Sequence, residues 1–576
     1  MNQPAGAFCL VLHSHLPYVL DHGTWPHGAD MLYEAGAETY IPVLHAVDTL
    51  AQEGHSPHLT IGITPVVAEQ LTDERFKHRF ADYLHMRIHY ANDNAQEFEW
   101  HRRDHLSWLA GRWRGHFEWL LRTFEETYQG DLVGAFARLQ EQGHIEILTS
   151  AATHAYLPLL LEEVSVEAQV KQGVQTHERL FGRRPRGFWL PECGYRPGGD
   201  WRPPQAITGE PWEERYRAGL EDILGRNGID YFIVDSQMLG ASAEPLPVYV
   251  SWQDTLGKLW GKIARLREPL PYNGDKTPYA PYFVGGQFED HPPVAAFVRD
   301  PRTGLQVWSR DWGYPGDGSY LDFHKKHFPG GHRYWRVTDS LGDLGTKQEY
   351  EPDMAADRVQ QNASHFASLV KSVLAENPRP DGQLPVLCAP FDAELFGHWW
   401  FEGPDWLQMT GRSLDADPEV ALMTCGEYLA KHSPTSVVSL PEGSWGQGGQ
   451  HWVWLNDWTI WIWQREYQAE LAMQSLVRDH WHSAHEDAKD LMRQAARELF
   501  LLQASDWQFL ITTWTARDYA EARANGHESD FKRIADLARR QASGQSLSAE
   551  DRAYIQELKE RDKLFPDIDP AWFLIV

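Results

Sequence analysis

The amino-acid sequence predicts an α/β fold: an incomplete (β/α)7 barrel with a small helical insertion and an all-helical C-terminal domain. Short apolar runs recur along the chain, and most end in polar residues before a helix-like segment. Strands that alternate with helices pair in parallel, and a closed parallel barrel carries its active site at the carboxyl ends of its strands. The alternative is an open doubly wound sheet, but no Gly-rich phosphate loop follows any of the runs. The barrel is therefore the favoured interpretation.

Seven apolar runs define the expected strands, one fewer than in an eight-stranded barrel. They are Ala7–Leu12, Leu59–Ile63, Ile145–Leu148, Gly187–Glu192, Tyr231–Val234, Leu305–Trp308 and Val386–Ala389. The polar residues that follow them include His13, Thr64, Thr149, Asp235 and Asp392. We expect these side chains to gather at one end of the barrel.

Two parts of the chain depart from the alternation of strands and helices. Residues 67–138 carry charged and aromatic residues at helical spacing, which predicts a helical insertion. From about residue 430 onward the pattern predicts helices, at Trp458–His480, His485–Ser505, Trp507–Ala524 and Ser529–Ser543. The expected domains are a catalytic barrel of residues 1–66 and 139–429, an insertion of residues 67–138 and a helical domain of residues 430–576.

Composition restricts the class of partner. The chain has 53 Lys and Arg against 81 Asp and Glu, a formal net charge of −28, so a nucleic acid or an anionic membrane would be repelled. A neutral glucan would not be. The 26 Trp residues exceed ordinary usage. Flat apolar rings stack on pyranose faces, although many of these residues are expected in the core.

Other global features favour an ordinary cytoplasmic protein. The four cysteines, Cys9, Cys193, Cys388 and Cys425, lie far apart and form no CxxC pair, so a disulfide scaffold is not expected. The N-terminal segment lacks the basic residues of a secretory signal. No apolar stretch approaches the roughly 20 residues that span a bilayer.

Two carboxylates each end an apolar run, which is how a strand would deliver an acid into a sugar-lined pocket. Glu192 follows Trp189 and Pro191, and Asp392 precedes an aromatic segment that can shield it from water. Two such acids are the minimum for cleaving a glycosidic bond, by inversion or by retention. The structural alternatives are an ion pair of Glu192 with Arg196 and a helix-capping role for Asp392.

A pair of histidines, His13 and His15, ends the first expected strand, and both should point the same way. We favour hydrogen bonds from neutral imidazoles to sugar hydroxyls. A metal site completed by His154 and Asp235 is the rival hypothesis. The Gly-rich segment 442–449 lacks the Lys of a phosphate loop, so it is better suited to presenting Trp445 to a sugar chain.

At the level of motifs, the sequence resembles glycoside hydrolase family 57, and within it the 1,4-α-glucan branching enzymes. The resemblance runs through nearly the whole chain and rests on five ordered motifs, His13–Tyr18, Gly62–Pro65, Trp189–Glu192, Phe391–Trp400 and Glu442–Gly446. It implies a seven-stranded barrel, a small helical insertion and a helical C-terminal domain that helps to close the active cleft. It also implies a retaining mechanism, with Glu192 as nucleophile and Asp392 as general acid/base, and no metal or organic cofactor.

Further site residues are carried over from the same resemblance. His13 and His154 would hold the sugar at the cleaved bond, Asp506 would face the cleft, and we group His15 and His398 with these substrate-binding residues. The cleft would be lined by Trp25, Trp308, Trp399, Trp445 and Trp454. The expected partner is an α-1,4-glucan such as amylose or glycogen, bound by a monomer or weak oligomer.

The long segment 238–290 is the part of the chain in which the resemblance places the residue that distinguishes branching from hydrolysis. Branching members carry a loop tyrosine that shields the glycosyl intermediate from water, and here Tyr249, Tyr272, Tyr279 and Tyr282 compete for that role. On the motif resemblance, branching is the first hypothesis, and a 4-α-glucanotransferase or α-amylase of the same family is the second. A metal-dependent deacetylase or amidohydrolase and a glycan-binding protein without catalysis are the alternatives from other classes.

Overall fold

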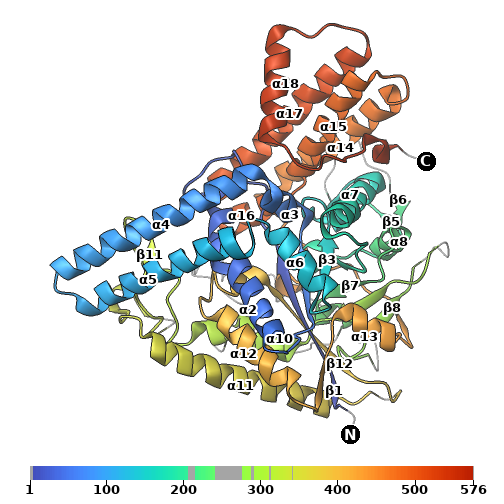
Figure 1. Ribbon diagram of the computed structural model, residues 1–576. Coiled ribbons are helices and arrows are strands. Elements are labelled where there is room, and N and C mark those ends of the chain that lie inside the picture. Colours follow the sequence, from blue (N-terminus) through green and yellow to red (C-terminus); the bar gives the residue numbers. More distant parts are fainter. Residues whose placement is uncertain are drawn as a thin grey trace.

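A computed structural model describes residues 4–204, 214–240, 276–286, 291–309, 313–339, 342–379 and 381–574. It confirms the predicted fold class, because a largely parallel sheet is surrounded by helices and followed by a helical C-terminal region (Figure 1). None of the described helices is long and apolar enough to cross a membrane. Two of the candidate loop tyrosines, Tyr249 and Tyr272, lie outside the described residues.

The central sheet is built from parallel strands in the order β12-β1-β2-β3-β4-β7-β9. These strands are β1 (Gly6–Ser14), β2 (Leu59–Ile63), β3 (Ile145–Ser150), β4 (Gly187–Trp189), β7 (Tyr231–Val234), β9 (Ala295–Val298) and β12 (Val386–Asp392). At the edge, β8 (Tyr282–Val284) pairs antiparallel with β9 and parallel with β14 (Val437–Val438), while β13 (Val420–Leu422) pairs with β1. The strands are buried on both faces, which explains why they read as continuous apolar runs.

The two ends of this strand order meet. Arg299, directly after β9, forms a parallel bridge with Cys388 of β12, and the Asp300 N–H donates to the Cys388 carbonyl at 2.9 Å. The row of strands therefore curves back on itself instead of remaining an open sheet. Among the described residues, this contact between the segment after β9 and β12 is a bridge of a single residue pair, so only a short length of backbone joins the two ends of the barrel.

One expected strand is wrong. Residues 305–308 belong to α10 (Pro301–Trp308), whose N-cap Asp300 accepts a hydrogen bond from the Thr303 N–H and whose first position is proline. Both features initiate helices and outweigh the apolar character of the run. The strand at this place in the sheet is β9, whose first two residues are alanine.

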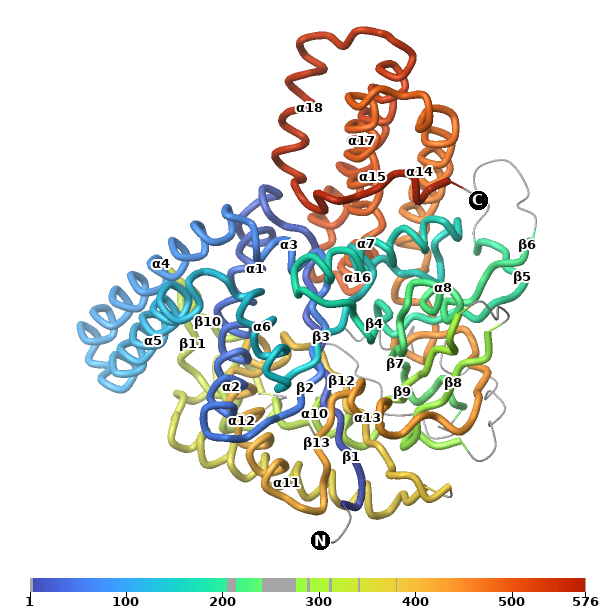
Figure 2. Tube along the Cα trace, turned by 45° about the vertical axis from the view of Figure 1, so that its right-hand side comes forward, coloured from blue at the N-terminus to red at the C-terminus, as the bar shows by residue number. Residues whose placement is uncertain are grey.

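Helices cover the outside of the barrel, and two of them project from it. The surrounding helices include α1 (Ala29–Ala35), α2 (Ile41–Gln52), α3 (Pro65–Thr72), α6 (Leu132–Glu141), α7 (Glu163–Phe181), α8 (Leu220–Arg226), α11 (Pro352–Glu376), α12 (Gly403–Asp415) and α13 (Cys425–Lys431). Between β2 and β3, the helices α4 (Glu74–Trp100) and α5 (Asp104–Arg122) form an antiparallel hairpin that extends away from the barrel (Figures 1 and 2). Short hairpins, β5 (Gly199–Trp201) with β6 (Arg215–Arg217) and β10 (Lys326–His327) with β11 (His332–Arg333), decorate the connections.

The C-terminal helices stand at the opposite end of the molecule from the start of β1 (Figure 1). They are α14 (Ile460–His480), α15 (Glu486–Leu502), α16 (Asp506–Thr513), α17 (Arg517–Ala542) and α18 (Ala549–Arg561). The boundary predicted between the helices at 507–524 and 529–543 is wrong. The first helix ends at Thr513, and α17 then continues without interruption from Arg517 to Ala542. The helix expected at Trp458–His480 corresponds to α14, whereas residues 432–459, at the start of the domain predicted to be helical, contain β14 and one short turn of 3₁₀ helix.

Candidate active site

The two acids lie at the carboxyl ends of β4 and β12. Glu192 sits in the turn after β4 with a left-handed backbone (φ 59°), and the next residue, Cys193, is also left-handed (φ 49°). Left-handed backbone costs a non-glycine residue about 1–2 kcal/mol, so the surrounding structure holds this turn in a strained form. Asp392 ends β12, where its backbone pairs in register with His13 of β1. The barrel thus delivers both carboxyls to the same end.

A second segment of the chain fixes Glu192. Gly443 forms an antiparallel bridge with Tyr195, and the Trp445 backbone N–H donates to the Glu192 carbonyl at 3.1 Å. The Trp445 indole Nε1 donates to Glu192 Oε2 at 2.7 Å. The indole also packs edge-on against Trp189, with ring centroids 5.2 Å apart. Trp445 is therefore a direct hydrogen-bond partner of the expected nucleophile, which the sequence did not predict.

Burial controls the protonation of the acid pair. It raises the pKa of Glu192 to about 8, with a further increase from the negative charge of Asp392 and an opposing decrease from the Trp445 N–H. Burial also raises the pKa of Asp392 to about 6, against the opposing charges of Arg299 and His15. Between these two values the pair holds one proton, which is the state that acid-assisted attack on a glycosidic bond needs.

Arg299 is a charged residue of the site that the sequence reading missed. Its guanidinium lies 3.4 Å from Asp235 Oδ2 and 5.9 Å from the centre of the Trp445 ring. Asp235, a candidate metal ligand in the rival hypothesis, is thus paired with an arginine and also caps its own turn. The apolar run before Arg299 is the signal that would have identified a strand end here.

The histidines form a stacked group. The His15 and His154 rings are 3.8 Å apart, the Nε2 atoms of His13 and His154 are 3.1 Å apart, and His13 stacks on Trp189 at 4.4 Å. Burial lowers the pKa of His13 and of His154 well below the usual value, which keeps both imidazoles neutral near pH 7. Neutral stacked imidazoles suit hydrogen bonding to hydroxyl groups.

The helical C-terminal region contributes directly to this group. Asp506, the first residue of α16, lies 2.9 Å from His15 Nε2, whose other ring nitrogen contacts the Thr64 hydroxyl at 3.2 Å. Next to Asp506, the Ser505 hydroxyl lies 3.1 Å from His154 Nδ1. The orientation of two barrel histidines therefore depends on the turn before α16.

Next to Asp392, the motif after β12 forms a second acidic layer. Glu394 accepts hydrogen bonds from the Tyr40 hydroxyl at 2.7 Å and from the backbone N–H of His15 at 3.2 Å, and burial raises the pKa of Glu394 to about 8. His398 Nδ1 lies 2.7 Å from Glu38 Oε2. Although burial acts to raise it, the pKa of Glu38 falls to about 2 because of Arg333 and His398. His398 is thus engaged in this ion-pair network.

The expected cleft tryptophans divide by exposure. Trp25 is 73% exposed and Trp399 is 49% exposed, with Trp399 packed on Phe323 at 4.2 Å. Trp308, at the end of α10, is half-buried, 6.4 Å from Trp445. Trp454 is only 1% exposed and stacks on Tyr156 at 4.5 Å, so its ring belongs to the core. Sequence spacing could not distinguish it from the exposed rings.

Two candidate loop tyrosines are described, and both are anchored. The Tyr279 hydroxyl donates to Asp300 at 3.0 Å and its carbonyl accepts the N–H of Val386, the first residue of β12. Tyr282 begins β8, beside the first residues of β9, and donates to the Thr277 carbonyl at 2.9 Å. Tyr282 lies toward the amino end of β9, whereas Tyr279 extends from the amino end of β12 to Asp300, just past the carboxyl end of β9.

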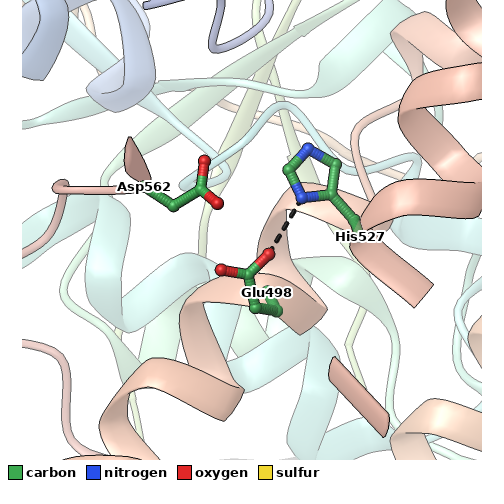
Figure 3. A group of neighbouring side chains, drawn as sticks. All are labelled: Glu498, His527 and Asp562. Carbon is green, nitrogen blue, oxygen red and sulfur yellow. Dashed lines mark hydrogen bonds and ion pairs between the residues drawn. The ribbon is translucent and has the colours of Figure 1, made fainter. Parts of the chain in front are cut away.

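A separate group of possible metal ligands lies in the C-terminal region (Figure 3): Glu498, His527 and Asp562, all buried. His527 Nδ1 lies 2.9 Å from Glu498 Oε2, and its Nε2 receives a hydrogen bond from Arg523 at 3.0 Å. Asp562 is held by His22 and by Arg561. The neighbouring side chains already bind His527 and Asp562, and two of these neighbours, Arg523 and Arg561, carry guanidinium groups. We therefore interpret Glu498, His527 and Asp562 as part of an internal ion network.

Comparisons with known proteins agree with this geometry. The family model of glycosyl hydrolase family 57 matches residues 9–441, and that of the 1,4-alpha-glucan branching enzyme C-terminal domain matches residues 466–573. The chain is 38% identical to a 1,4-alpha-glucan branching enzyme of Thermococcus kodakarensis over 97% of this chain and 77% of that protein.

Solved structures give the same result. A GH57-type branching enzyme of Pyrococcus horikoshii superposes with a TM-score of 0.87 at 36% identity, covering 99% of this chain and 97% of that one. The alpha-amylase AmyC of Thermotoga maritima superposes with a TM-score of 0.77 at 28% identity, covering 99% of both chains. The strands, the two acids and these matches together show that the chain belongs to glycosyl hydrolase family 57.

Proposed function

We propose that this protein is a 1,4-α-glucan branching enzyme, which cleaves an α-1,4 bond of a glucan and transfers the released chain to a 6-hydroxyl. One observation supports this choice above the others. The segment that matches the branching-enzyme C-terminal model contains Asp506, which contacts His15 of the barrel at 2.9 Å. The segment that matches the branching-enzyme model thus reaches the proposed catalytic group. The relative with 38% identity is itself a branching enzyme.

The proposed reaction is a double displacement with retention. A Glu192 oxygen attacks the anomeric carbon, the bond from that carbon to the 4-oxygen breaks, and Asp392 gives its proton to the departing 4-oxygen. The glycosyl group is then an ester of Glu192. In the second step a glucan 6-hydroxyl gives its proton to the Asp392 carboxylate and attacks the anomeric carbon, which releases Glu192 and forms an α-1,6 branch. Attack by water would give hydrolysis.

The contacts of each acid suit these roles. The Trp445 N–H donates to the ionised Glu192 and stabilises the anion that attacks. Burial raises both pKa values, to about 6 and about 8, so the pair carries one proton between them, and the productive state has that proton on Asp392. The pH dependence is the same for either placement, because both states carry one proton.

The remaining assignments follow from placement. His13, His15 and His154 are positioned to bind hydroxyls of the sugar at the cleaved bond, with Asp506 orienting His15. Trp25, Trp308 and Trp399 would line the cleft. For the loop tyrosine we favour Tyr249 or Tyr272, which lie outside the described residues, because the hydroxyls of Tyr279 and Tyr282 already donate to Asp300 and to the Thr277 carbonyl. We also propose a cytoplasmic monomer or weak oligomer acting on glycogen-type glucans, consistent with its four free, buried cysteines.

The decisive experiment is incubation with amylose. Branching predicts new α-1,6 linkages, counted as chains released by a debranching enzyme, in excess of new reducing ends. Reducing ends without branches would contradict the proposal and would favour α-amylase, the second candidate, which the similarity to AmyC supports. Glu192→Gln, a near-isosteric control, should abolish both products. Loss of activity with a chelator would favour the metal-dependent alternative.

A further inference from the structure

Helix α16 connects the active site to a strained, exposed tryptophan. It begins at Asp506, which contacts His15, and ends eight residues later at its C-cap, Trp514. Trp514 has left-handed backbone angles (φ 61°, ψ 15°). Glycine is the usual residue there, because left-handed backbone strains bulky side chains. A bulky aromatic residue at this position is therefore an outlier that the helix end itself does not require.

The ring of Trp514 remains open to solvent in spite of its neighbours. Trp514 is 50% exposed. Its ring meets Trp458 edge-on at 5.9 Å, and Trp458 meets Trp452 edge-on at 6.5 Å. The Arg517 guanidinium lies 4.8 Å from the Trp514 ring centre. Three half-buried or exposed indoles thus form a row, with Arg517 at its outer end.

The row is connected to the proposed site along the chain in two directions. Trp452 and Trp458 follow the segment 443–449 that holds Trp445 against Glu192. An α-helix rises about 1.5 Å per residue, so Trp514 stands roughly 12 Å along α16 from the residue that touches His15. Near the start of α17, Tyr519 packs against His27, two residues after the exposed Trp25, at 5.8 Å. The row of indoles is thus joined to the site through α16, which begins at Asp506, and through the chain that precedes Trp452.

We propose that Trp514, supported by Trp458, is a binding subsite for the distal part of a bound α-glucan chain. Glucan is the occupant because an exposed flat ring stacks on pyranose faces, and because a neutral chain is not repelled by a protein with a net charge of −28. The proposal rests on the proposed function for the identity of the glucan. It explains why strain is retained at a position where glycine would be easier.

The test separates a binding role from a structural one. All proteins carry Glu192→Gln, which makes them inactive. Amylose affinity is measured by calorimetry for this parent and for the parent with Trp514→Gly or Trp514→Tyr, together with each melting temperature. Trp514→Gly removes the ring and suits the left-handed backbone, so it should bind amylose roughly 3- to 10-fold more weakly without losing thermal stability. Trp514→Tyr keeps an aromatic ring and should stay within about twofold of the parent.

Two controls complete the design. A glucan too short to leave the catalytic centre, such as maltose, should bind all three proteins equally. Trp100→Gly, which removes an 84% exposed tryptophan at the far end of α4, should leave amylose affinity unchanged. Unchanged amylose affinity in Trp514→Gly would overturn the subsite, as would an equal loss for maltose. Because binding is measured without turnover, a protein that hydrolyses instead of branching would defeat the proposed function and leave this result intact.

Discussion

Replacing Trp445 by phenylalanine should reduce catalysis by removing one hydrogen bond to the nucleophile. The indole Nε1 donates to Glu192 Oε2 at 2.7 Å, and phenylalanine has no donor at that position. A hydrogen bond to a charged group contributes about 1.5–3 kcal/mol. At about 1.4 kcal/mol per tenfold change, kcat/KM for amylose should fall roughly 10- to 150-fold near pH 7.

The same substitution should change the pH dependence in a defined direction. The Trp445 N–H opposes the burial that raises the pKa of Glu192, so its loss should raise that pKa further above about 8. The limb of the pH profile at high pH should then move upward. The assay is kcat/KM for amylose from pH 5 to pH 10, with the melting temperature as a check on folding.

The fold should tolerate the Trp445→Phe substitution, so a loss of activity can be assigned to the missing hydrogen bond. Phenylalanine retains a ring against Trp189, and the backbone N–H of residue 445 still reaches the Glu192 carbonyl. Trp100→Phe, an exposed substitution distant in the fold, serves as the control. A loss smaller than about twofold at every pH, with the profile unmoved, would refute the role given to the indole.

Three other predictions follow from the described contacts. With pKa values of about 6 and about 8 for the acid pair, activity needs the singly protonated state, so kcat/KM should rise as pH passes about 6, peak near 7 and fall through about 8; a profile flat from pH 5 to 9 would contradict this. Asp506→Ala should lower kcat/KM roughly tenfold by releasing His15, whereas Asp506→Asn, which keeps an acceptor oxygen, should lose less; equal losses would argue against orientation of the imidazole. Gly397→Ala should lower the melting temperature by several degrees, since its φ is +110° and a Cβ would lie 1.7 Å from a backbone carbonyl oxygen. Gly54→Ala, with φ +85° but open space around it, should show only the smaller cost of backbone strain, and similar shifts would rule out the clash.

The sequence predicted strands well where a run is apolar on both faces. The runs that became β1, β2 and β12 are buried along nearly their whole length, so composition alone indicates them. It failed where local helix signals compete, as in residues 301–308, and where small residues dominate, as in β9. The residue after β9, Arg299, was missed for the same reason.

Within the site, motifs indicated which side chains take part but not what they touch. The spacing of His13 and His15 predicted a shared orientation, and their rings do lie 6.3 Å apart with nearly parallel planes. No pattern in the sequence could place Trp445 against Glu192, because that contact joins residues 253 positions apart. Exposure is also invisible to spacing, so Trp454 in the core and Trp399 on the surface looked alike.

The contact between His15 and Asp506 joins residues 491 positions apart. Contacts of such long sequence separation form late, because the intervening chain must first be ordered. During synthesis the barrel strands and the acids emerge well before Asp506, and domains tend to fold as they appear. A nascent chain would therefore hold a complete acid pair but unoriented histidines. We therefore expect the protein to become active only after α16 has docked and Asp506 contacts His15.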